Sequence, residues 1–286
     1  MLPAAAAAAG VVPALSRRHP GLKRDTPALS GLSAGNAHRV RRPIRLPIRF
    51  PMRFPGPLTE GRLVRRYKRF LADVEMADGR LVTAHCANPG AMLGLVEPGR
   101  PVLLSASTNP ARKLAWSWEL VEADLPGGPQ WVGINTARPN ALVAEAFHEG
   151  RLSPLSGATS WRAEVAYGRA SRVDFLAGDA AGPIHVEVKN CHLMRRPGLA
   201  EFPDCVAARS ARHMDELAEV VRLGGRAVVI WVVQMRAERF AVAGDLDPGF
   251  DAAFRRARAA GVAAHAFTCR IDRNAVTIGT EIPIVE

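Results

Sequence analysis

The chain has 286 residues, of which 48% are hydrophobic and 23% charged, with a formal net charge of +11 at pH 7. This balance excludes wholesale disorder and leaves enough chain for one or two domains with a buried core. Its four cysteines form no C-x-x-C pair, which excludes a disulfide scaffold or zinc ribbon and favours a reducing, cytoplasmic setting. The longest uncharged apolar stretch, residues 1–16, is shorter than the roughly 20 residues of a membrane span, so we expect no membrane partner.

The basic excess is concentrated in residues 1–51. They contain nine Lys and Arg and one acid, a net of +8, and the remaining residues have 29 basic and 26 acidic side chains, a net of +3. An Arg- and Ala-rich, acid-poor segment is typical of transit peptides and of basic arms that bind nucleic acid. We expect residues 1–56 to be a disordered extension, and Met52, at the start of the first well-patterned stretch, is an alternative start of the protein.

Residues 57–136 have the pattern of short strands separated by turn residues. We predict strands over 62–74, 80–86, 101–107, 115–123 and 130–134, with a turn at Asp78-Gly79. Five short strands indicate a small barrel or sandwich. A barrel of this size suits the oligonucleotide-binding (OB) type, although the number of strands does not distinguish the two architectures.

The first predicted strand is strongly basic. Aromatic residues Tyr67 and Phe70 stand among five cations, which are Arg62, Arg65, Arg66, Lys68 and Arg69. Cations that bind phosphate together with aromatic rings that stack on bases favour contact with nucleic acid. A solvated edge strand protected by charge explains the pattern equally well.

From residue 138 onward, helical and strand patterns alternate. We predict helices over 140–148, 205–223 and 250–260, and strands over 161–167, 173–177, 184–189, 227–233 and 262–268. The apolar run 227–233 is typical of a strand buried on both faces. This order indicates an α/β domain built around a mixed sheet.

Two acids and a lysine on neighbouring strand candidates are the strongest chemical signal. The period of two in a strand places Glu187 and Lys189 on one face, and Asp174 can converge with Glu187 if their strands are neighbours. Two carboxylates with a backbone carbonyl and waters suit Mg²⁺ or Mn²⁺, and a nearby lysine can orient a bound water. An acid-x-Lys pattern is also common on exposed strand edges, so the order of helices and strands around it carries part of the argument.

Four further residues are weaker candidates. Glu164, on the preceding strand, and Glu145, on the preceding helix, can each add a metal ligand or be ordinary solvated acids. Arg209 and His213 are four residues apart on a predicted helix and therefore share a face. That face can contact substrate phosphate or be plain surface.

Several motifs, in chain order, resemble the sugar fermentation stimulation protein (SfsA) family. They lie at residues 66–73, 85–92, 118–120, 135–136, 164–168, 171–175, 187–189 and 202–213. The resemblance implies an OB-type barrel at 57–136 that binds DNA, followed by a PD-(D/E)XK nuclease-like domain at 137–286. It also implies that Asp174, Glu187 and Lys189 form the metal-and-water set, with Glu164 as a candidate additional acid.

Two functional hypotheses follow from the resemblance. The first is a metal-dependent nuclease that binds DNA without sequence preference. The second is a catalytically silent DNA-binding regulator of sugar (maltose) metabolism genes. The pairing of two carboxylates with Lys189 favours the first, and nothing in the sequence supports a sugar-binding protein. The sequence leaves the oligomeric state open, a homodimer included.

Overall fold

The computed structural model describes residue 54, residues 56–167 and residues 171–285. The predictions for residues 1–51 therefore lie outside the described residues. No helix in the described ranges is long and apolar enough to cross a membrane.

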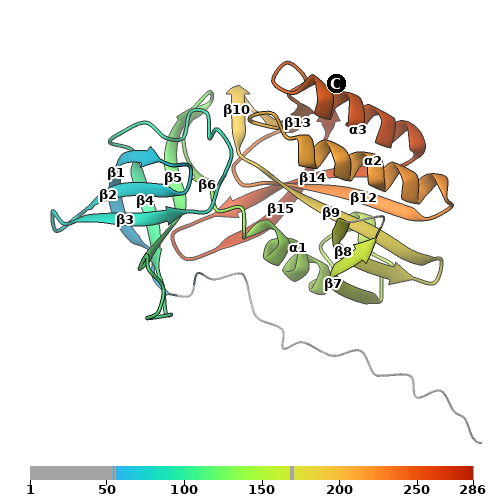
Figure 1. The fold of residues 1–286 in the computed structure, drawn as a ribbon, viewed down its shortest axis with the longest axis horizontal. Helices are drawn as coiled ribbons and strands as arrows, with labels where there is room; N and C mark the ends of the chain where they lie inside the picture. The colour runs from blue at the N-terminus through green and yellow to red at the C-terminus, as the bar shows by residue number, and fades with distance from the viewer. Residues whose placement is uncertain (1–53, 55, 168–170, 286) are drawn as a thin grey trace, which may run out of the picture. The chain divides into compact units, whose positions relative to one another are not determined.

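The first six strands form a sheet that closes on itself (Figure 1). They are β1 (Thr59–Tyr67), β2 (Leu71–Met76), β3 (Leu81–Cys86), β4 (Pro101–Ala106), β5 (Trp116–Leu125) and β6 (Gly128–Gly133). The sheet order is β3-β2-β1-β4-β5-β6, and β3 also pairs with β5, which closes a five-stranded barrel flanked by β6. Alternate side chains such as Leu63, Val74 and Trp118 are fully buried, as the period of two requires. The expected OB-type barrel is confirmed.

The predicted strand 62–74 was wrong, because two strands and a tight turn occupy this region. The chain turns at residues 68–70, where Lys68 and Arg69 have φ of 47° and 63°. This left-handed region favours Gly or Asn, whereas here it is occupied by two long cations. The usual composition of a turn is therefore missing from the sequence.

The remainder of the chain is an α/β domain around a six-stranded mixed sheet of order β15-β14-β12-β9-β8-β7. Its strands are β7 (Ser160–Tyr167), β8 (Ser171–Asp179), β9 (Gly182–Cys191), β12 (Arg226–Val233), β14 (Ala263–Ile271) and β15 (Val276–Ile282). Strands β9, β12 and β14 are parallel, and the others pair antiparallel with their neighbours. The α/β class expected from the sequence is confirmed.

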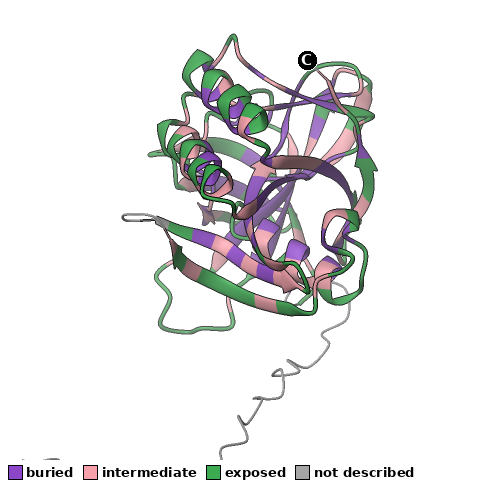
Figure 2. Ribbon diagram, turned by 90° about the vertical axis from the view of Figure 1, so that its right-hand side faces the viewer, coloured by how far each residue is buried: buried purple, intermediate pink, exposed green. Residues whose placement is uncertain are grey.

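Helices cover both faces of this sheet (Figures 1 and 2). The helices are α1 (Pro139–His148), the short 3₁₀ helix η1 (Ser153–Leu155), α2 (Ala208–Arg222) and α3 (Pro248–Ala260). Leu142 of α1 packs in one core with Val188 and Ile230, while Leu217 of α2 packs in the other core with Trp231. Neighbouring residues of β9 and β12 therefore point to opposite helix layers.

A second, four-stranded sheet was not predicted. It contains β10 (Leu193–Arg196), β11 (Leu199–Phe202), β13 (Arg239–Val242) and β16 (Ile284–Val285). Strands of four residues or fewer are too short to show a clear hydrophobic period, which explains the omission.

The start of α2 is positioned by α3. Asp247 caps α3 by accepting a hydrogen bond from the backbone amide of Phe250 at 2.9 Å, and its other carboxylate oxygen accepts one from the amide of Ala207 at 2.7 Å. Because Ala207 immediately precedes α2, this contact determines where α2 begins beside β9.

Candidate active site

Strands β8 and β9 bring Asp174 and Glu187 to the same place. Phe175 pairs with Val186 at the end of their antiparallel ladder, so one further step would set Asp174 opposite Glu187. At that step, Oδ2 of Asp174 instead accepts a hydrogen bond from the backbone amide of Val188 at 2.8 Å. Asp174 and Glu187 therefore lie close together on neighbouring strands, as inferred from the sequence.

The second oxygen of Asp174 contacts α1. Asn140, in the first turn of that helix, donates a hydrogen bond from Nδ2 to Oδ1 of Asp174 at 2.8 Å. Burial raises the pKa of Asp174, and so does the negative charge of Glu187, against the opposing effect of the two hydrogen bonds and Lys189. Sequence reasoning used Asn140 only as a helix start, since nothing local indicates its contact 34 residues away.

Glu187 and Lys189 share a face of β9, as predicted. Nζ of Lys189 lies 2.6 Å from Oε1 of Glu187, and both side chains are buried. Burial acts to raise the pKa of Glu187, but the hydrogen bond from His213 and the charge of Lys189 outweigh it and lower that pKa. Glu187 is therefore held as a carboxylate inside the protein.

One oxygen of this carboxylate is left without a partner. Oε2 of Glu187 is buried and has no hydrogen-bond partner among the described residues. Because buried polar atoms are almost always satisfied, such an oxygen calls for an explanation, and a bound cation is one. The donor set of carboxylate oxygens suits a hard cation such as Mg²⁺.

His213, which the sequence offered as a candidate contact for substrate phosphate, lies in this cluster. The residue is buried on α2, and its Nδ1 contacts Oε1 of Glu187. Arg209 donates from Nε to Nε2 of His213 at 3.5 Å, so the two residues do share a face. With Nε2 accepting, the proton of a neutral imidazole is on Nδ1 and is donated to Glu187. The inward rotation of α2 decides this placement.

No third carboxylate completes the site. Within the described ranges, no three His, Cys, Asp or Glu side chains are grouped closely enough to hold a metal ion. Glu164 is exposed on β7 with φ of 54°, and Glu145 is half-buried on α1. The side chains that the structure brings together are Asp174 and Glu187, so a cation there would keep several waters, as Mg²⁺ usually does.

Tyr167 is a further residue near the carboxylates that sequence reasoning assigned no role. Burial raises its pKa, and the charges of Glu187, Glu216 and Asp174 raise it further, so the phenol keeps its proton. Tyr167 lies at the end of β7, where only the pairing of β7 with β8 brings it near the site.

The five cations predicted to bind nucleic acid have different surroundings. Arg62 donates to the carbonyl of Gly99 at 3.1 Å, Arg65 pairs with Asp73 at 2.8 Å, and Arg66 donates to carbonyls of the loop that follows β3. Lys68 and Arg69, in the turn, have no such partner within the described part of the chain. Nearby, Phe70 is 47% exposed. Two of the five cations are therefore available for an external phosphate without losing an internal bond.

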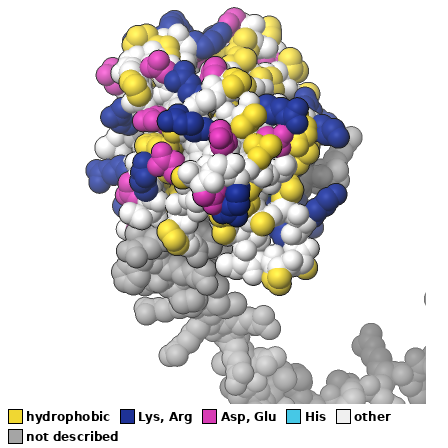
Figure 3. All heavy atoms as spheres, turned by 90° about the vertical axis from the view of Figure 1, so that its left-hand side faces the viewer, with side chains coloured by type: hydrophobic (Ala, Val, Ile, Leu, Met, Phe, Trp, Pro, Cys, Tyr) yellow, Lys and Arg dark blue, Asp and Glu magenta, His cyan; other side chains and the backbone are white. Residues whose placement is uncertain are grey.

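Charge on the barrel side of the molecule is mixed. Figure 3 shows Lys and Arg side chains interspersed with Asp and Glu over this face, with no continuous basic patch. This distribution agrees with the small net charge of residues 52–286. It favours modest electrostatic attraction to nucleic acid.

Family models match nearly all of the described chain. The SfsA N-terminal OB domain matches residues 64–134, and the sugar fermentation stimulation protein RE domain matches residues 137–275. Among similar structures is that of Pyrococcus furiosus SfsA in complex with Ca²⁺, with a TM-score of 0.74 and 23% identity, covering 83% of this chain and 100% of that chain. That likeness confirms the fold.

The similarity to relatives of high identity extends over nearly their full length. The sugar fermentation stimulation protein homolog of Methylobacterium nodulans is 81% identical over 229 residues, covering 80% of this chain and 97% of the relative. The homolog of Azorhizobium caulinodans is 52% identical over 231 residues, covering 80% and 98%. The chain therefore belongs to the sugar fermentation stimulation protein (SfsA) family.

Proposed function

We propose that this protein is a metal-dependent nuclease that hydrolyses phosphodiester bonds in DNA. The observation that carries the proposal is the convergence of Asp174 and Glu187 beside Lys189, with Oε2 of Glu187 buried and lacking a partner among the described residues. A buried, charged and incompletely satisfied cluster is costly for a fold, which favours a functional reason for it.

Asp174 and Glu187 would hold a divalent cation such as Mg²⁺ or Mn²⁺, which in such sites polarises a phosphodiester and acidifies bound water. The similar protein of Pyrococcus furiosus is described in complex with Ca²⁺, another cation that prefers oxygen ligands. The hydrogen bond from His213 occupies Oε1 of Glu187 and leaves Oε2 for the cation.

The chain's own residues supply the rest of the chemistry. Lys189, held by Glu187 at 2.6 Å, is a fixed positive charge that stabilises the negative charge developing on the phosphate and orients the attacking water. Asn140 and the amide of Val188 hold the carboxylate of Asp174 in one orientation. This arrangement is organised before substrate arrives, which lowers the cost of reaching the transition state.

The barrel would supply sequence-independent affinity. Lys68 and Arg69 are available for phosphate, and Phe70 is exposed for stacking. Arg209, exposed in the first turn of α2 and in contact with His213, adds a cation beside the site.

A second candidate function is a catalytically silent DNA-binding regulator of sugar (maltose) metabolism genes. The observation that favours it is the absence of a group of three ligating side chains from the part of the chain that the structure describes. Two carboxylates hold a cation more weakly than three, so metal binding decides between the two functions.

Cleavage and metal binding test the proposal together. Labelled DNA and RNA are incubated with the purified protein in Mg²⁺, Mn²⁺ or EDTA, and Mn²⁺ is titrated calorimetrically into the wild type and Asp174→Asn. We expect metal-dependent cleavage by the wild type, and neither cleavage nor Mn²⁺ heat from Asp174→Asn. Lys189→Ala should bind Mn²⁺ but lose activity by orders of magnitude.

Asp215→Asn is the matched control, since Asp215 is an exposed acid on α2 that pairs with Arg256. It should behave as the wild type. Indistinguishable Mn²⁺ heats from the wild type and Asp174→Asn would contradict the nuclease proposal and leave the regulator.

A further inference from the structure

A cavity of about 430 Å³ adjoins the candidate active site. Its lining includes Lys189 and Asn140, the partners of the two site carboxylates, and also Asn88 and Gly90 of the barrel loop. Ser210 of α2 lines it as well. The cavity therefore connects the barrel with the chemistry of the α/β domain.

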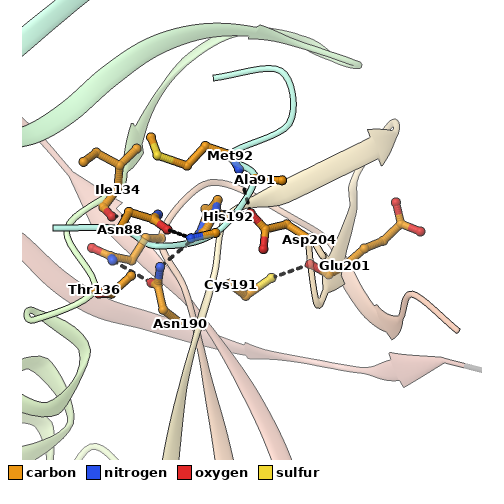
Figure 4. Close-up of polar contacts among 12 residues, drawn as sticks. Asn88, Ala91, Met92, Ile134, Thr136, Asn190, Cys191, His192, Glu201 and Asp204 are labelled. Atoms are coloured by element: carbon orange, nitrogen blue, oxygen red, sulfur yellow. Dashed lines mark hydrogen bonds and ion pairs between the residues drawn. The ribbon is translucent and has the colours of Figure 1, made fainter. Parts of the chain in front are cut away.

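Hydrogen bonds link the walls of this cavity to one another (Figure 4). Asp204 accepts a hydrogen bond from the backbone amide of Met92 at 2.7 Å, and its Oδ2 lies 3.2 Å from Nε2 of His192. The other ring nitrogen of His192, Nδ1, lies 3.0 Å from Nδ2 of Asn190. Asn88 donates to the carbonyl of Ile134 at 3.0 Å. Figure 4 shows these side chains bridging the barrel loop and the ends of the strands. The cavity is thus formed before any ligand binds, as binding pockets usually are.

One cation that lines the cavity is left without a partner among the described residues. Of the two acids in the lining, Glu201 is paired with Arg195 at 2.8 Å, and Asp204 is hydrogen-bonded to His192 at 3.2 Å. Arg69 lines the cavity and has no ion-pair or hydrogen-bond partner for its guanidinium within the described ranges. A ligand therefore meets one unpaired cation, Arg69, and the ammonium of Lys189, which is paired with Glu187.

The beginning of α2 adds to this attraction for an anion. Ala207 precedes the helix and offers no side-chain cap to its first amides, and the first turn contains no acid. Both Ala207 and Ser210 line the cavity. The amide of Ala207 itself is bonded to Asp247, but the amides of the first turn have no side-chain cap. Such amides bind phosphate, and here they accompany a cavity and a free cation.

The other walls are apolar. Leu193, Phe202, Pro203 and Val206 line the cavity, and Val206 is 74% exposed. A base needs an apolar wall and its phosphates need cations, and this cavity has both. Its volume is that of pockets that enclose one small organic ligand, so it takes one nucleotide and not a base pair with two backbones.

We propose that this cavity is a subsite for a single unpaired nucleotide next to the scissile phosphate. The inference rests on the proposed nuclease function and specifies its substrate class, namely single strands and duplexes with a bulged or frayed nucleotide. A continuous duplex binds less well, because a paired nucleotide must first leave its stack to enter the cavity.

Binding in EDTA tests the subsite without catalysis. The probes are a fluorescein-labelled single strand, a duplex with one bulged nucleotide and the corresponding fully paired duplex, followed by fluorescence anisotropy. We expect the wild type to bind the first two about tenfold more tightly than the third. Equal affinities for all three probes would overturn the proposal.

Two variants assign this preference to the cavity. Ser210→Leu narrows the cavity, and Val206→Glu places a negative charge at an exposed position of its lining, where folding tolerates it. Each should reduce binding of the single strand and the bulged duplex to the level of the paired duplex, whose binding should not change. Retention of the wild-type preference by both folded variants would also overturn the proposal.

Ser156→Leu is the matched control, because Ser156 is an exposed serine next to η1 that does not line the cavity. It should keep the wild-type preference. The failure of the nuclease proposal can be distinguished from the failure of the subsite proposal. A binding preference in EDTA without any cleavage in Mg²⁺ or Mn²⁺ contradicts only the nuclease. Cleavage without the binding preference contradicts only the subsite.

Discussion

The carboxylate of Asp204 accepts a hydrogen bond from the backbone amide of Met92, which is 2.7 Å away and 112 residues earlier in the chain. The contact joins the barrel loop to the segment between β11 and α2. Gly90 makes the approach feasible, since a Cβ on this residue would lie 2.6 Å from Oδ2 of Asp204. One acid and one glycine thus form part of the seam between the barrel and the α/β domain.

The stability supplied by Asp204 should depend on pH. Burial acts to raise its pKa, but the hydrogen bond and charge of His192 and the amide of Met92 outweigh it and lower the pKa to about 2. A carboxyl with a lowered folded pKa stabilises the fold above its unfolded pKa of about 4, and this contribution is lost as the pH falls toward 2. Asp204→Asn should lower the free energy of unfolding by about 1–2 kcal/mol at pH 7, and less at pH 3. Urea unfolding at both pH values checks this, and a deficit that does not change with pH would contradict it.

Glu119 should be a major determinant of stability. This buried carboxylate, 2% exposed, accepts hydrogen bonds from Ser105 at 2.7 Å, from Asn135 at 2.8 Å and from two nitrogens of Arg138. Arg138→Ala would leave a buried charge without its counterion and should cost about 3–5 kcal/mol of unfolding free energy. Arg80→Ala, which breaks an exposed pair with Asp78, should cost less than about 1 kcal/mol. Similar losses in the two variants, measured by urea unfolding, would count against this account.

Arg66 and Arg69 should affect different properties. Arg66 donates to the carbonyls of Asn88 at 2.8 Å and Gly90 at 2.9 Å, so Arg66→Ala should lower the unfolding free energy by about 1–3 kcal/mol. Arg69→Ala should leave stability unchanged but weaken binding to all DNA sequences alike, with the salt slope reduced by about one unit. Thermal unfolding and DNA titrations at several salt concentrations separate the two effects. A loss of stability with Arg69→Ala would show that its guanidinium has a structural partner.

His213 should act on the metal through Glu187. Because its Nδ1 contacts Oε1 of Glu187, His213→Ala frees this carboxylate to rotate, and we expect Mn²⁺ affinity to fall by about 10–100-fold. DNA binding in EDTA should persist. His265→Ala, which removes an imidazole that pairs with Glu281 at 2.6 Å, is the matched control and should leave Mn²⁺ binding unchanged. Equal calorimetric affinities in the two variants would exclude the positioning role.

Local patterns were sufficient for much of the fold and for part of the site. The apolar run of β12, the stop of α3 at Gly261 and the alternation that places Glu187 and Lys189 on one face all depend on residues close together in the sequence. The period of a strand or helix is a property of the backbone, so it can be read without knowing the partners. The turn at Lys68 and Arg69 was missed because its left-handed residues are not the usual ones.

The partners of the site residues were decided by tertiary structure. Asn140 reaches Asp174 across 34 residues, His213 turns inward to Glu187 and not outward to solvent, and Arg66 is bonded to a loop of the barrel. Each of these contacts depends on strand register and on the rotation of a helix against its sheet. Those quantities are set by packing between segments distant in the chain, so no short stretch of sequence contains them.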